Sequence, residues 1–152
     1  LDATYKSFPG AGCNLAQTLV WTGASGCVQD LTGQPLQFAP EHTANIGISY
    51  EKELSSGLLL SAGLDYNWSD DVVVSADLDE NLVQESFGKL NGRIAFAGND
   101  QWQISLVGKN LTNEKTFMWG NDIPLGSLGF RGSYFKLIDP PRTFEITGRV
   151  NF

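Results

Sequence analysis

Apolar and polar residues alternate with a period of two along most of the chain after residue 41. The first alternating stretch is HTANIGISYEK, residues 42–52. Because successive side chains of a β-strand point to opposite faces, this period is typical of a strand with one apolar and one polar face. The same alternation recurs in residues 57–69, 85–97, 101–112 and 142–152, and a shorter alternating piece covers residues 1–8. We therefore expect five strands and the end of a sixth.

The connections between these strands alternate in length. Residues 53–57 and 98–100 are tight, whereas residues 70–84 and 113–141 are long. No segment keeps the 3.6-residue period of an amphipathic helix. Tight and long connections in turn are typical of an up-and-down antiparallel meander, with turns at one end and loops at the other. The pattern thus predicts an all-β fold.

Strand length and the apolar faces favour a membrane environment. Soluble strands usually run about 5 to 6 residues, whereas a tilted strand needs about 9 to 11 residues to cross a bilayer. The predicted strands have the longer length, and we expect their apolar faces to lack charge. Aromatic residues mark both ends of these faces: Tyr50, Phe96, Trp102 and Phe152 toward the tight turns, and Tyr66, Trp68 and Phe144 toward the long loops. We therefore expect part of a transmembrane β-barrel with two aromatic girdles, and a soluble sandwich is the alternative.

The opposite faces of the strands are polar and would line a lumen that is wet or filled by polar protein. Five or six strands are too few to enclose a roomy barrel, so we expect the chain to be part of a larger one. The residues expected to face the lumen include Asn45, Asp65, Asn67, Arg93, Lys109 and Arg149.

Charge and composition exclude several other classes of protein. The formal net charge is -7 and no Lys/Arg cluster occurs, which argues against a nucleic-acid partner because such a site needs concentrated cations. No apolar run approaches the ~18 residues of a spanning helix. The first residue is Leu rather than Met, so we expect a fragment or a processed chain.

The chain contains two cysteines, Cys13 and Cys27. They flank one Gly/Ser/Thr-rich stretch, which fits a local disulfide in an oxidising compartment; two unrelated free thiols are the alternative on spacing alone. Metal binding is disfavoured, since the single histidine, His42, is distant in sequence and no CxxC is present.

Three motifs and the chain end occur in an order that carries a family resemblance. Residues 39–43, APEHT, precede the first long strand, and residues 108–113, GKNLTN, close the penultimate strand. Residues 141–143, PRT, open the last strand, and Phe152 ends the chain. Over residues 30–152 the chain resembles the C-terminal portion of a TonB-dependent outer-membrane receptor.

This resemblance implies a barrel of about 22 strands occluded by an N-terminal plug. Such receptors reside in the outer membrane of Gram-negative bacteria, surrounded by lipid, and take up scarce ligands: ferric siderophores, cobalamin, haem or oligosaccharides. The inner-membrane TonB complex supplies energy through a short N-terminal box. The chain would provide only the last five or six strands, with residues 1–41 a strand end plus an extracellular loop and residues 42–152 five strands.

The resemblance also assigns roles to residues at the chain end and in the first loop. It places Cys13 and Cys27 in a surface loop that passes through an oxidising compartment, which favours the disulfide. It makes the terminal strand the signal for barrel assembly and the strand that pairs with the barrel's first. The residues in that signal are Phe144, Ile146, Val150 and Phe152.

Two loops are candidate ligand sites. Residues 69–81, SDDVVVSADLDEN, are acidic, but the Gly and Glu of an EF-hand loop are missing, so a solvated loop is expected. Residues 117–135 are rich in aromatics and Gly, which could gather a small-molecule ligand or pack loop against loop. The candidate contacts are Phe117, Trp119, Phe130, Arg131 and Tyr134.

No enzyme is expected, because no nucleophile with a base at a recognisable spacing occurs, and neither does a phosphate-binding Gly loop. No cofactor or metal is expected either. Asn110-Leu111-Thr112 matches a glycosylation sequon, but a turn motif at the strand end is the preferred interpretation. Besides uptake, the open alternatives are a secreted carbohydrate-binding β-sandwich and another type of outer-membrane barrel.

Overall fold

The computed structural model describes residues 2–54, 57–98, 101–123 and 133–151. It divides into two compact units that alternate along the chain. We call residues 43–69, 87–115 and 140–152 the sheet unit, and residues 1–42, 70–86 and 116–139 the loop unit. Each unit is described by itself.

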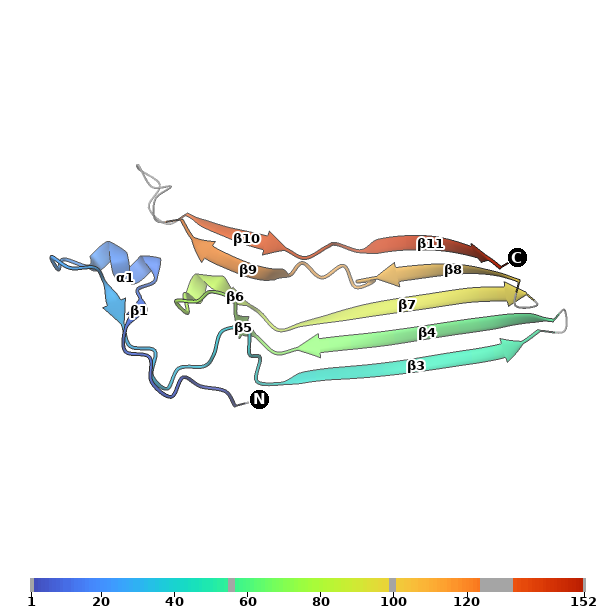
Figure 1. Cartoon of the computed structure of the whole chain (residues 1–152), viewed down its shortest axis with the longest axis horizontal. Coiled ribbons are helices and arrows are strands. Elements are labelled where there is room, and N and C mark those ends of the chain that lie inside the picture. Colours follow the sequence, from blue (N-terminus) through green and yellow to red (C-terminus); the bar gives the residue numbers. More distant parts are fainter. Residues whose placement is uncertain (1, 55–56, 99–100, 124–132, 152) are drawn as a thin grey trace. The chain divides into compact units, whose positions relative to one another are not determined.

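The sheet unit is one antiparallel sheet of five strands (Figure 1). In spatial order these are β11 (Thr143–Val150), β8 (Trp102–Lys109), β7 (Phe87–Gly98), β4 (Leu58–Ser69) and β3 (Thr43–Glu53). Every neighbour along the chain is also a neighbour in this sheet, so the meander predicted from the connections is confirmed. The edge strands are β3 and β11.

The pairing register places the apolar positions of all five strands on one face. One row across the sheet joins Ile48, Leu64, Gly92, Gly108 and Phe144. The next row toward the 98–102 turn joins Tyr50, Ala62, Ile94, Leu106 and Ile146. A shift of one residue in any pairing would move all apolar side chains of that strand to the other face. All four pairings instead place the apolar residues on the same face, so the hydrophobic pattern specifies this register.

The apolar face is exposed rather than packed under other elements. Ile46 and Ile48 are each 71% exposed and Ile146 is 77% exposed. Apolar patches on soluble monomers rarely extend this far. Lys52 shares a cross-strand row with Leu60 and Phe96, so the expectation of a wholly uncharged face is wrong at this one position among the described strand residues. It lies next to the end of β3, where a long side chain can carry its charge beyond an apolar band.

The aromatic residues of this face separate along the strands. Phe96, Trp102 and Tyr50 fall in the three rows nearest the 98–102 turn. Phe144, Tyr66 and Trp68 fall in the next three rows. No described row contains members of both groups, but Tyr50 and Phe144 stand in adjacent rows. The expectation of two girdles separated by an aliphatic band is therefore wrong at the centre of the face, where Phe144 of the last strand lies beside the Tyr50 row. Phe152 lies outside the described residues.

The loop unit contains short elements. Its two-stranded antiparallel sheets pair β1 (Ala11–Gly12) with β2 (Val28–Gln29), β5 (Val72–Val73) with β6 (Val83–Gln84), and β9 (Phe117–Asp122) with β10 (Tyr134–Ile138). It also has α1 (Leu15–Val20) and the 3-10 helix η1 (Glu80–Leu82). A small core forms around Leu82, Val74, Leu31 and Ala11, each no more than 3% exposed. Among the described residues no helix is long and apolar enough to span a membrane.

The structure differs from the sequence predictions in three places. Residues 2–8 hold a single isolated bridge, Thr4 with Pro35, and no strand end. The stretch 113–141, predicted as loop, contains β9 and β10, whose alternation is interrupted by Gly120 and a register shift after Leu137. The six-residue helix α1 is too short to show a 3.6-residue period, and it depends on a capping box between Asn14 and Gln17.

Candidate functional site

A chain of polar side chains crosses the polar face of the sheet unit. Asn45 donates to Asn67, whose amide donates to Asp65 Oδ1 at 2.9 Å. Asn91 donates to the same Asp65 oxygen at 2.9 Å and accepts from the backbone N–H of Asn110, also at 2.9 Å. The network links β3, β4, β7 and the residue that follows β8.

Asn110 anchors the turn after β8. It is 4% exposed and has a φ of 51°, in the left-handed region that Asn tolerates better than most residues. Its Oδ1 accepts from the backbone N–H of Glu114 at 3.0 Å, and its Nδ2 donates to the Glu114 carbonyl at 3.0 Å. Asn110, the first residue of the glycosylation-like motif, is therefore a buried turn residue. The structure agrees with the preferred interpretation of this motif as a turn at the strand end.

The same turn directs Leu111 onto the opposite, apolar face of the sheet. A Cβ on Gly108 would lie 2.6 Å from Leu111 Cδ2 and 3.2 Å from the Phe144 ring, and a Cβ on Gly92 would lie 3.3 Å from Leu111. The paired glycines of β7 and β8 thus make room for Leu111 and Phe144. Arg142, just before β11, donates to the Leu111 carbonyl at 3.4 Å and adds a contact from the last strand.

Charged residues gather around a hollow on the polar face. The hollow has a volume of about 590 Å³, and Asp65, Asn91, Arg93 and Lys109 are among its lining residues. The register places Asn45, Asp65, Asn67 and Arg93 on this face with Lys109 and Arg149, which is the set expected to face a lumen. The surface carries both signs of charge and could bind polar groups.

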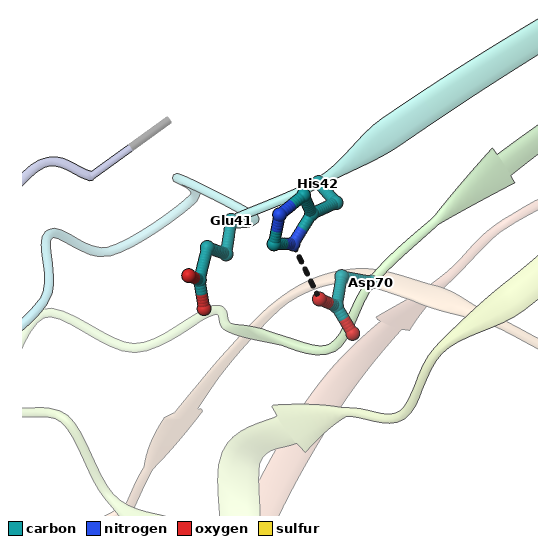
Figure 2. A group of neighbouring side chains, drawn as sticks. All are labelled: Glu41, His42 and Asp70. Carbon is teal, nitrogen blue, oxygen red and sulfur yellow. Dashed lines mark hydrogen bonds and ion pairs between the residues drawn. The ribbon is translucent and has the colours of Figure 1, made fainter.

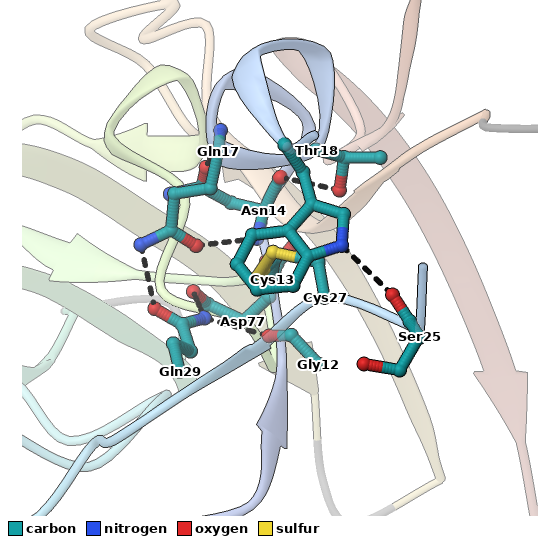
Figure 3. Close-up of a disulfide and its surroundings, with 10 residues drawn as sticks. Gly12, Cys13, Asn14, Gln17, Thr18, Ser25, Cys27, Gln29 and Asp77 are labelled. Carbon is teal, nitrogen blue, oxygen red and sulfur yellow. Dashed lines mark hydrogen bonds between the residues drawn. A yellow bond between two sulfur atoms is a disulfide. The ribbon is translucent and has the colours of Figure 1, made fainter. Parts of the chain in front are cut away.

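In the loop unit a disulfide joins Cys13 to Cys27, with Cα atoms 5.6 Å apart (Figure 3). Gln29, two residues beyond, donates from Nε2 to the carbonyls of Gly12 at 2.7 Å and Asp77 at 2.8 Å. The Gln29 contact ties the disulfide-closed loop to the acidic segment 69–81. Sequence spacing alone gave no sign of this connection.

The aromatic hairpin β9–β10 shows mixed packing. Trp119 and Phe135 meet edge to face, with ring centroids 5.0 Å apart, and the Lys136 ammonium lies 4.1 Å from the centroid of the Phe117 ring. The Tyr134 hydroxyl accepts from Asn81 Nδ2 at 3.0 Å. Trp119 is 43% exposed despite this contact. Phe130 and Arg131 lie outside the described residues.

Glu41, His42 and Asp70 form a polar cluster in the loop unit (Figure 2). Their ligand atoms all lie within 4.8 Å of one another, and His42 Nδ1 is 3.4 Å from Asp70 Oδ2. The backbone N–H of Asp71 lowers the pKa of the Asp70 carboxyl. The His42 side chain is 68% exposed, which suits a solvated contact between chain segments better than a closed metal site.

The acidic segment is not uniformly solvated, and the expectation of a solvated loop is wrong for Asp79. This residue is 1% exposed. Its Oδ1 accepts from the backbone N–H of Asn81 at 2.8 Å and so caps η1. Burial raises the pKa of the nearby Asp122 carboxyl, and the charges of Asp77 and Asp79 raise it further. Sequence reasoning missed this grouping, because Asp122 comes from β9.

Comparisons with known proteins agree with this architecture. In the solved structure of the ferric yersiniabactin uptake receptor FyuA from Yersinia pestis, a segment superimposes on the chain with a TM-score of 0.66 and 18% sequence identity. The match covers 82% of this chain and 17% of that receptor. A comparison with curated protein sequences finds no match.

The family assignment comes from a family model rather than from the fold alone. The model described as "TonB dependent receptor-like, beta-barrel" matches residues 12–111, which include β3, β4, β7 and β8. The sequence motifs and the five-stranded meander point the same way. The chain therefore belongs to the family of TonB-dependent receptor-like β-barrels.

Proposed function

We propose that the chain forms the C-terminal strands of an outer-membrane receptor that takes up a scarce ligand with energy supplied by TonB. The observation that carries the proposal is the exposed apolar face continuous over five strands in a member of this family. A surface of this kind matches the lipid-facing band of a membrane barrel. The long edge strands β3 and β11 would pair with strands elsewhere in the parent protein.

The ligand class that we propose is a ferric siderophore. The name of the similar FyuA structure describes uptake of ferric yersiniabactin, and the loop unit offers exposed aromatic and cationic groups. Trp119, Phe135 and Lys136 would contact such a ligand from the extracellular side. The polar face of the sheet, with Arg93 and Lys109, would line the lumen against a plug supplied by the parent chain.

The proposal is tested by deleting the gene for the full-length parent protein. Growth of the deletion strain is measured under iron limitation on a panel of ferric siderophores, and separately on haem, cobalamin and oligosaccharides. Loss of growth on one ferric siderophore, restored by the intact gene, is the expected result. Loss confined to haem, cobalamin or a sugar would correct the ligand class, and no loss on any ligand would contradict uptake.

Membrane location is tested independently of the ligand. Fractionation of cells producing the parent protein should recover it in the outer membrane and require detergent for extraction. Recovery in the soluble periplasm would instead support the alternative of a carbohydrate-binding sandwich.

A further inference from the structure

The apolar face of the sheet unit contains a hollow of about 390 Å³. This volume lies within the range of about 300 to 1,000 Å³ that is typical of small-molecule sites. Three small residues, Ala62, Gly92 and Gly108, line the hollow and keep its floor low. Taller apolar side chains stand around them, among them Leu64, Leu106, Leu111 and Phe144. The hollow therefore offers an apolar chain more contact than a flat surface would.

Arg142 lies beside this hollow on the side of the long loops. It precedes Phe144 by two residues, which places both on the same side of the last strand. Its Nη1 donates to the Leu111 carbonyl at 3.4 Å, and both Leu111 and Phe144 line the hollow. Arg142 is exposed, and no carboxylate oxygen of the described residues lies within 4.0 Å of its guanidinium nitrogens. The rim of the hollow thus carries a positive charge that these residues do not match.

The Tyr66 hydroxyl lies at the same end of the hollow. Tyr66 is opposite Leu90 in the register, and Gly88 is one row closer to the long loops. A Cβ on Gly88 would collide with the Tyr66 hydroxyl, so this ring points toward the loops. The Leu90 carbonyl accepts from the Leu111 N–H at 2.7 Å. Leu111 thereby links the level of Tyr66 to that of Arg142.

The order of these groups along the strands matches the order of groups in a membrane lipid. An apolar hollow comes first, and a phenol hydroxyl and a guanidinium follow toward the loop end. Tyrosine favours the boundary between acyl chains and headgroups, and arginine attracts anionic headgroups. A neutral apolar molecule would leave the charge of Arg142 unmatched, and a free anion would leave the hollow empty. An anionic lipid satisfies both.

We propose that the hollow and Arg142 bind one phosphorylated, anionic lipid of the surrounding membrane. One acyl chain lies against Ala62 and Gly92, and the phosphate accepts from the Arg142 guanidinium, whose planar fork matches phosphate oxygens. This site retains a particular lipid by its headgroup, whereas the rest of the apolar face contacts acyl chains of any lipid. The proposal rests on the membrane location under Proposed function and is independent of the transported ligand.

The test uses the purified full-length parent protein in detergent, stripped of its native lipid. Native mass spectrometry measures binding of dimyristoyl phosphatidylglycerol, which is anionic, and of dimyristoyl phosphatidylcholine, which has the same chains and is zwitterionic. Arg142→Gln removes the charge and keeps a donor for the Leu111 carbonyl, and Ala62→Phe fills the hollow. The matched controls are Arg149→Gln on the polar face and Gly148→Phe on the apolar face, where a Cβ has nothing within 4 Å.

The wild type and both controls should bind one phosphatidylglycerol more tightly than phosphatidylcholine. Arg142→Gln should lower the affinity for phosphatidylglycerol by about 5-fold, the factor expected for one arginine beside an anionic lipid, and should leave phosphatidylcholine unaffected. Ala62→Phe should weaken both lipids. Equal affinity of the wild type for the two lipids, or equal loss in Arg142→Gln and Arg149→Gln, would overturn the proposal. So would a dimer of the parent protein that Ala62→Phe abolishes, because a second copy would then occupy the hollow.

A second measurement on the wild type covers a variant that fails to fold. The preference for phosphatidylglycerol should disappear at about 1 M NaCl, where the screening length falls to about 3 Å. Inorganic phosphate at the concentration of the lipid should not displace it, since a free anion gains nothing from the hollow. Displacement by phosphate, or a preference that salt leaves unchanged, would contradict the site. A parent protein that needs detergent for extraction yet shows no headgroup preference would overturn this inference and leave the membrane location standing.

Discussion

Gly108 illustrates how one residue couples a turn to two strands. The turn held by Asn110 sends Leu111 over β7 and β8 on the apolar face, where a side chain at position 108 would collide with Leu111 and crowd Phe144. The Gly-x-Asn-Leu pattern of residues 108–111 is therefore a packing requirement as well as a turn signal. Gly108 leaves space for the side chains of Leu111 and Phe144, and Asn110 adopts the left-handed backbone conformation that the turn requires.

Replacing Gly108 with Val should destabilise the folded barrel of the parent protein. Overpacking of this kind costs about 1 to 3 kcal/mol, because Leu111 and Phe144 must both move. Urea denaturation followed by tryptophan fluorescence measures the loss. Gly148→Val is the matched control, since a Cβ at Gly148 has nothing within 4 Å; equal destabilisation by both changes would contradict the packing role.

The burial of individual acidic residues in segment 69–81 could not be predicted from the sequence. Asp77 and Asp79 are predicted to be solvated because they occur in a polar, acidic stretch. Asp79 is nevertheless buried and Asp77 half-buried. The contacts come from Ser75, from Gln29 of β2 and from the β9–β10 hairpin, and no sequence pattern links these segments.

At the scale of elements, period-two alternation located the long strands well. The predicted ranges for β3, β4 and β7 differ from the observed bounds by about 1 or 2 residues, within the usual uncertainty of strand ends. The range for β8 was too long, because the positive φ of Asn110 ends the strand at Lys109. The hairpin β9–β10 was missed, since its residues do not alternate cleanly between apolar and polar.

The register predicts opposite tolerance for charge at two positions of β8. Leu106→Arg would place a charge in the middle of the apolar face and should reduce folded barrel in the outer membrane, at a cost of about 2 to 4 kcal/mol. Gln103→Arg, on the polar face of the same strand, should be much milder. Heat-modifiable migration of the parent protein in gels measures the folded fraction; equal losses would argue against this register.

At the scale of the whole molecule, the two units differ in what holds them together. The sheet unit relies on backbone pairing between long strands, whereas the loop unit has a small core and a disulfide. Closing a loop of this size contributes about 3 kcal/mol in the chain-entropy model. The disulfide was expected from the resemblance, but its contact through Gln29 with the acidic segment required the structure.

Removing the disulfide should therefore loosen the loop unit and leave the sheet unit intact. In the Cys13→Ser/Cys27→Ser double variant of the parent protein, amide hydrogen exchange should quicken in residues 11–29 and 77–84. Exchange in β3, β4 and β7 should stay as in the wild type. Unchanged exchange in residues 11–29 would show that the other contacts of the loop suffice.

The central claim is that these strands cross the outer membrane with their apolar face toward lipid. Spin labels placed singly at positions 103 to 106 of β8 in the membrane-inserted parent protein test it directly. Labels at Ile104 and Leu106 should be accessible to oxygen dissolved in lipid and protected from a water-soluble nickel relaxant, and labels at Gln103 and Ser105 should lack this lipid signature. A lipid signal without period two, or nickel access at Ile104 and Leu106, would contradict the account.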